Sequence, residues 1–151
     1  MGHHVVVGVD GSESSKAALG WAIRQARLTG AAVDAVIAWQ YPMAYTYPIP
    51  MPPETTAKEL ARRVLDQAIY EVGEQVPEHA EITPKVVEGH PARVLVDAAE
   101  DADLLVVGSR GHGGFVGALL GSTGQHCVHH ATCPVVVIRD SVTSAGGPPS
   151  A

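Results

Sequence analysis

Short apolar runs alternate with longer amphipathic stretches along the 151-residue chain. The apolar runs are rich in valine, which is typical of strands that are buried on both faces of a parallel sheet. They predict five strands, over residues 4–9, 33–39, 82–88, 104–107 and 134–138. Most of the stretches between them repeat apolar residues every three or four positions, as amphipathic helices do. They predict helices after Ser12 and over about 53–76, 91–100 and 122–131.

Individual residues mark several helix ends. Ser12 or Ser14 can cap the first helix, and Gly30 is the residue type that ends a helix in a left-handed conformation. Pro91 suits the first turn of the third helix. The residues expected on the inner faces of the helices are Ala18, Trp21, Ala22, Gln25, Ala26, Ala57, Leu60, Ala61, Val64, Leu65, Ala68, Val72, Val94, Leu95 and Ala98.

The alternation of strands and helices predicts the α/β fold class: a single, doubly wound, mainly parallel sheet with helices on both faces. Residues 1–140 are expected to form one domain, and 141–151, rich in Gly, Pro and Ser, a disordered tail. Such sheets bind ligands beyond the carboxyl ends of their strands. Asp10 follows the first strand and Gly108 the fourth, so both face one crevice if these strands are neighbours.

The segment Tyr41–Pro53 differs from the rest of the chain. Five of its thirteen residues are proline, which precludes a regular helix or a central strand. We expect a loop, and long loops in compact domains are often functional. The favoured interpretation is a surface excursion, and the alternative is a lid over a bound ligand.

Composition excludes several classes of protein. The hydrophobic fraction of 46% supports a packed core, and the formal net charge of −6 argues against a nucleic-acid partner. No apolar run is long enough to span a membrane. Cys127 and Cys133 lack the spacing of a zinc site, so they are interpreted as small hydrophobic residues in a reduced, cytoplasmic compartment. His3 and His4 are given no functional weight.

A glycine-rich segment follows the fourth strand. Gly108-Ser109-Arg110-Gly111 is separated by nine residues from Gly121-Ser122, where a helix begins. Glycines let an anion approach backbone N–H groups closely, and a helix start adds further donors. Ser122 can add a hydroxyl while capping the helix. The alternative is a set of ordinary turn glycines and a helix cap.

The polar residues around these glycines also allow two interpretations each. Arg110 can neutralise phosphate charge or be a solvated loop residue. The carboxylate of Asp10 can accept from ribose hydroxyls or complete an Asx turn that needs no ligand. His126 and His130 share a helix face, but a metal site there is disfavoured because no carboxylate lies nearby in the sequence.

Other chemistries lack their motifs. The chain has no G-x4-G-K-[ST] segment, no G-x-S-x-G nucleophile motif and no G-x-G-x-x-G fingerprint. Its three lysines, Lys16, Lys58 and Lys85, lie outside the glycine segment. Fast phosphoryl transfer, which commonly uses a lysine or an arginine at the γ-phosphate, is therefore disfavoured.

Four segments together resemble the universal stress protein family. They are Val6–Ser12, Gly89–Ala92, Asp103–Gly111 and Cys133–Val137, and the resemblance covers roughly residues 4–139. The spacing G-x2-G-x9-G-[ST], complete here, marks the ATP-binding members of that family.

The resemblance implies a sheet order of 3-2-1-4-5 and a homodimer formed through the last strand, Pro134–Ile138. It implies that Asp10 and Gly108 meet the ribose, that Gly108 also meets the first phosphate, and that Ala38 meets the adenine. It also implies Mg²⁺ or Mn²⁺ held through the phosphates, with no metal bound by protein side chains alone. The expected nucleotide-binding residues are Asp10, Ala38, Gly108, Arg110, Gly111, Gly121, Ser122 and Thr123.

We therefore expect a cytoplasmic, ATP-binding regulator of the stress response that acts as a homodimer, has no catalytic residues and signals to a protein partner. The alternatives are a slow ATPase, a protein that binds AMP or cAMP, and an interaction protein that no longer uses a nucleotide. Neither a nucleic acid nor a membrane is expected as a partner.

Overall fold

The computed structural model describes residues 3–40, 54–110 and 120–139. The segment 41–53, Gly111 and the tail 141–151 lie outside these ranges, so the predictions made for them stay predictions. The elements are β1 (His4–Gly8), α1 (Glu13–Thr29), β2 (Ala32–Trp39), α2 (Glu54–Gln75), β3 (Ile82–Glu88), α3 (Pro91–Ala98), β4 (Leu104–Gly108), α4 (Ser122–His130) and β5 (Val135–Ile138).

The five strands form one sheet in the order β3-β2-β1-β4-β5, and every neighbouring pair is parallel. This confirms the predicted fold class and strand order. Val6 in the central strand pairs with Asp34 on one side and Leu105 on the other. The chain leaves β1 toward β2 and β3, and later returns to β4 and β5, so the strand order reverses between β1 and β4. A ligand site is expected at the carboxyl end of this pair.

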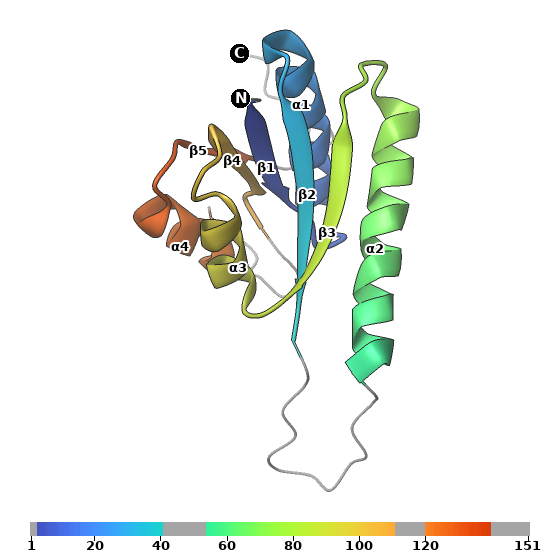
Figure 1. The fold of residues 1–151 in the computed structure, drawn as a ribbon, viewed down its shortest axis with the longest axis vertical. Helices are drawn as coiled ribbons and strands as arrows, with labels where there is room; N and C mark the ends of the chain where they lie inside the picture. The colour runs from blue at the N-terminus through green and yellow to red at the C-terminus, as the bar shows by residue number, and fades with distance from the viewer. Residues whose placement is uncertain (1–2, 41–53, 111–119, 140–151) are drawn as a thin grey trace, which may run out of the picture.

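The two faces of the sheet are covered by different helices (Figure 1). Because strand side chains alternate, Val5 and Val7 face α1 and α2, whereas Val6 faces α3 and α4. Leu19 and Leu65 are fully buried on the first face. Figure 1 shows α3 and α4 lying together on the other side of the strands from α2.

The cap residues follow the sequence in part. Ser12 caps α1 by accepting a hydrogen bond from Ser15 N at 3.2 Å, and Gly30 ends that helix with φ of 76°. The prediction that Ser122 caps α4 is wrong. Gly121 occupies the cap position, and Ser122 is the first helical residue.

The inner face of α2 is narrower than its apolar pattern suggested. Leu60 and Val64 are 53% and 38% exposed, although both were expected inside. This helix packs against α1, β2 and β3, so only a narrow stripe reaches the core. In α3 the expected residue Ala98 is exposed, and Ala99, just after the helix, is fully buried.

Candidate functional site

A cavity of about 330 Å³ opens at the carboxyl end of the sheet, between β1 and β4. It lies where the reversal of strand order places a ligand site. Seven of the eight residues expected to bind a nucleotide line it, and the eighth, Gly111, lies outside the described residues. The lining residues are Gly8, Val9, Asp10, Ser15, Val36, Ala38, Pro91, Leu95, Val107, Gly108, Arg110, Gly121, Ser122, Thr123 and Gly124.

One part of the wall is apolar. Val36 and Ala38 come from β2, and Leu95 comes from α3. Gly8, at the end of β1, lets Leu95 pack against the strand, since a Cβ on Gly8 would lie 2.6 Å from Leu95 Cδ1. This part of the cavity offers a planar ring apolar contact on several sides.

The other part of the wall is polar and begins at the turn after β1. Gly11 has a φ of 86°, which disfavours any side chain there. Asp10 Oδ1 accepts hydrogen bonds from Ser12 N at 2.9 Å and from Ser12 Oγ at 2.5 Å. The Asx turn that the sequence allowed is therefore formed. A carboxylate has about four acceptor positions, so this turn does not by itself exhaust what Asp10 can accept.

Gly108 is required by packing as well as by any ligand. A Cβ at this position would lie 2.5 Å from Ser14 Oγ and 2.7 Å from the backbone carbon of Ser14. The end of β4 therefore fits against the first turn of α1 only because Gly108 has no side chain. The sequence suggested close approach of a phosphate as the reason for this glycine, and it could not reveal the neighbour from α1.

The start of α4 supplies backbone donors to the polar wall. The N–H of Gly121 donates to the carbonyl of Ser109 at 2.6 Å, so it is used within the protein. The first hydrogen bond of the helix runs from Gln125 N to Gly121 O, and no side chain caps the helix. Helix geometry leaves the N–H groups of Ser122, Thr123 and Gly124 without intrahelical partners, at the positive end of the helix dipole.

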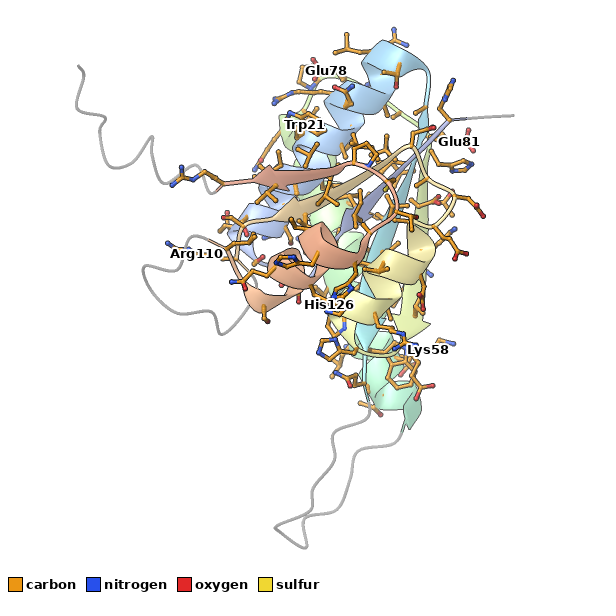
Figure 2. All side chains as sticks on the ribbon, turned by 90° about the vertical axis from the view of Figure 1, so that its left-hand side faces the viewer. Trp21, Lys58, Glu78, Glu81, Arg110 and His126 are labelled. Atoms are coloured by element: carbon orange, nitrogen blue, oxygen red, sulfur yellow. The ribbon has the colours of Figure 1, made fainter. Side chains whose placement is uncertain are left out.

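The two basic residues near the cavity, Arg110 and Lys16, differ in their exposure and in their ion pairing. Arg110 is exposed and lies beside the start of α4 (Figure 2). Lys16 lines a separate hollow between α1 and α2, which also includes Asp10. Its Nζ lies 2.8 Å from Glu71 Oε1, and this hydrogen bond raises the pKa of Lys16. Lys16 is thus tied to α2 by an ion pair.

Sequence reasoning missed several residues of the wall. Leu95 was expected only in the core, and Pro91 only as a helix start, although both come from the segment after β3 that contains Gly89–Ala92. Ser15 and Gly124 carried no separate signal. Ser15 lies three residues after Ser12, and Gly124 lies two residues after Ser122. Because residues three or four apart share a helix face, extending each motif by one helical turn could have found them.

A model of the universal stress protein family matches residues 1–139. The chain belongs to this family. A universal stress protein of Mycobacterium tuberculosis is 40% identical over 139 residues, which cover 92% of this chain and 46% of the relative. A universal stress protein of Mycolicibacterium smegmatis is 36% identical over 142 residues, covering 89% of this chain and 47% of the relative. The chain spans about half the length of these relatives.

Solved structures of universal stress proteins share the fold. One, in complex with cAMP, superposes with a TM-score of 0.70 at 25% identity, covering 91% of this chain and 97% of that chain. Another, from Archaeoglobus fulgidus in complex with dAMP, has a TM-score of 0.62 at 23% identity and covers 90% and 97%. The second likeness concerns the fold alone.

This universal stress protein also carries a histidine cluster on α4, outside the cavity wall. The ring centroids of His126 and His130 are 4.3 Å apart. Within residues 3–40, 54–110 and 120–139, no three His, Cys, Asp or Glu side chains are grouped so that they could hold a metal ion. In the same described part of the chain, no helix is long and apolar enough to cross a membrane.

Proposed function

We propose that this universal stress protein binds an adenine nucleotide in the cavity between β1 and β4. The observation that carries the proposal is the division of one cavity into an apolar wall and a wall of helix-start N–H groups. A purine base suits the first wall, and phosphate suits the second. The cAMP complex of a similar universal stress protein supports this assignment.

The residue roles follow the two walls. The base lies against Val36, Ala38 and Leu95. Asp10 accepts from the ribose hydroxyls, close to Gly108. The phosphates meet the N–H groups of α4 from Ser122 to Gly124, with Arg110 as a source of positive charge. The phosphate contact of Gly111 stays a prediction from the sequence. The N–H of Gly121 was expected to bind phosphate, but it already donates to the carbonyl of Ser109 and is not counted among these donors.

ATP is the nucleotide that the complete G-x2-G-x9-G-[ST] spacing favours. Among the described residues of the wall, Asp10 alone carries a carboxylate, so Mg²⁺ or Mn²⁺ would be held mainly through the phosphates. Among the described residues, no lysine lines the cavity, and Lys16 in the neighbouring hollow is paired with Glu71. We therefore propose that the protein holds ATP and does not turn it over rapidly.

Binding of AMP or cAMP is the second candidate. A single phosphate needs fewer donors than a triphosphate, and the engagement of Gly121 N–H by Ser109 O reduces the number on offer. The similar structure in complex with cAMP points the same way.

The proposed output is regulatory. We expect a cytoplasmic homodimer formed through β5, which reports the bound nucleotide to a protein partner during stress. The strand order places β5 at an edge of the sheet, where its backbone can pair with a second copy. The mycobacterial relatives are about twice as long as the part that this chain matches. The regulatory role of this chain is therefore proposed and is not taken over from those longer proteins.

Calorimetric titration with adenosine, AMP, cAMP and ATP, with and without Mg²⁺, tests the binding. Ala38→Leu fills the apolar wall and is expected to weaken every adenine ligand by more than about tenfold. Ala98→Leu, an exposed change on α3, is the matched control and should leave affinity unchanged. Wild-type protein that binds none of the four ligands would refute the proposal, and sustained ATP turnover would refute the non-enzymatic part.

A further inference from the structure

One buried hydroxyl joins the two halves of the cavity's polar wall. Ser14, in the first turn of α1, is only 2% exposed. Its Oγ donates to the carbonyl oxygen of Arg110 at 2.5 Å and accepts from the N–H of Arg110 at 3.3 Å. A single side chain therefore satisfies both backbone groups of the residue that follows Ser109 in the segment after β4.

The neighbouring serine does not duplicate this bridge. Ser12 Oγ lies 3.4 Å from the same carbonyl oxygen but 2.5 Å from Asp10 Oδ1. A hydroxyl has one hydrogen to donate, and the short contact to Asp10 takes it. Ser12 thus holds the Asp10 turn, while Ser14 holds Arg110.

The bridge extends to α4. Ser109 accepts from the N–H of Gly121 at 2.6 Å, so the first turn of α4 is tied to the same segment that Ser14 holds. The N–H of Ser109 in turn donates to Ile138 O at 2.8 Å. The path from Ser14 to Gly121 therefore consists of the hydrogen bonds at Arg110 and Ser109 and the peptide bond that joins these two residues.

We infer that Ser14 is a positioning residue for the phosphate side of the nucleotide, an inference that rests on the proposed function. It fixes Arg110 and the start of α4 relative to the Asp10 turn. The apolar wall comes from β1, β2 and α3, whereas the hydrogen bonds of the Ser14 side chain go to Arg110, which belongs to none of these elements. Loss of the hydroxyl is therefore expected to weaken phosphate contacts and to spare contacts with the base.

The test compares AMP with adenosine in Ser14→Ala. The ratio of the two affinities isolates the phosphate, because a general loss of stability at temperatures well below unfolding weakens both ligands alike. Affinity for AMP should fall on the order of tenfold, and affinity for adenosine by less than about threefold. Ile23→Val, which removes a buried methyl from the same helix, should leave the ratio unchanged.

A second variant separates the hydrogen bonds from the packing. Ser14→Cys fills the space that Ser14→Ala leaves empty, but its thiol is bulkier than the hydroxyl and a weaker hydrogen-bond donor, so it should reproduce the selective loss of AMP. A ratio that stays at the wild-type value in Ser14→Ala, or in Ser14→Cys alone, would overturn the inference. Wild-type protein that binds neither ligand would refute the proposed function itself, together with the role of Ser14.

Hydrogen exchange gives a readout that needs no ligand. In Ser14→Ala the amide of Arg110 should exchange faster by on the order of tenfold, because its acceptor is gone. The amide of Ala26, deep in α1, should keep its wild-type rate. Equal acceleration at both amides would indicate loosening of the whole helix and would contradict a local positioning role.

Discussion

The two faces of the sheet are built on the same strands but are covered by helices of different length. On one face α1 and α2 span 17 and 22 residues and cover the strands along their length. On the other face α3 and α4 have only 8 and 9 residues, and their N-terminal turns line the cavity at the carboxyl end of the sheet. The face with the long helices therefore mainly stabilises the fold, whereas the face with the short helices carries the apolar wall and the helix-start donors of the cavity.

The largest expected effect comes from deleting the same side chain on each face. On the face covered by α1 and α2, which we call the closed face, Leu65→Ala should lower the free energy of unfolding by about 3 kcal/mol. Leu65 is completely buried there, and its removal leaves a cavity. Leu95→Ala borders space that is already open, so its cost should be smaller by about 1 kcal/mol. Urea unfolding measures both values.

Nucleotide affinity should follow the opposite order in these two variants. Leu95→Ala is expected to weaken AMP at least about fivefold, whereas Leu65→Ala leaves AMP affinity unchanged below its unfolding temperature. If Leu65→Ala weakened AMP more than Leu95→Ala did, the two faces would not be separable in this way.

The next effect concerns the contact between the faces at the end of β4. Gly108→Ala places a Cβ within 2.8 Å of three atoms of Ser14, two of them backbone, so it should cost about 1–3 kcal/mol of stability. Thermal unfolding measures the loss. Stability equal to wild type would mean that α1 and β4 can separate without cost, against the packing described here.

A further prediction uses pH on the site-bearing face. Burial raises the pKa of the Cys127 thiol from its ordinary value of 9.0 to about 11, with Cys133 adding to the shift. A thiol with a raised pKa in the folded state favours folding below pH 9.0, and this contribution is lost as the pH rises toward 11. Urea unfolding between about pH 7 and 11 should therefore show a smaller alkaline loss in Cys127→Ala than in wild type.

That pH prediction has a clear contrary outcome. Other groups also titrate in this range, so only the difference between wild type and Cys127→Ala is informative. Parallel stability curves for the two proteins would mean that the thiol of Cys127 titrates as it does in the unfolded chain.

The smallest effect is a stabilisation on the closed face. Gly73 lies in α2, and a Cβ there would meet nothing within 4 Å. Gly73→Ala should raise the free energy of unfolding by about 0.5–1 kcal/mol through helix propensity. Chemical unfolding would detect it, and a loss of stability would indicate that the outer side of α2 is not open as described.

The sequence predicted the parallel sheet and its helices well because valine-rich runs and helical spacing are local signals. It also grouped Asp10 and Gly108 at one end of the sheet, since parallel strands end at a common edge, and the family resemblance added Ala38. The comparison of motifs with a known family supplied the strand order, which periodicity alone does not encode.

What the sequence could not predict depends on distant neighbours. The close packing of Gly108 against Ser14 involves residues that are 94 positions apart (108 − 14), and no local sequence pattern predicts it. The same holds for the use of Gly121 N–H by Ser109 O, and for the exposure of Leu60, which reflects how little of α2 the sheet can cover.

The proposal on which the others depend is that the face covered by α3 and α4 holds an adenine nucleotide at its carboxyl end. Titration of ¹⁵N-labelled protein with AMP, followed by amide chemical shifts, tests it most directly. Saturable shifts are expected at Ala38, Gly108 and the first turn of α4, with little change at Leu65 and Val72 on α2. Shifts confined to α2, or no saturable shift at any concentration up to about 10 mM, weaker than ordinary nucleotide sites, would contradict it.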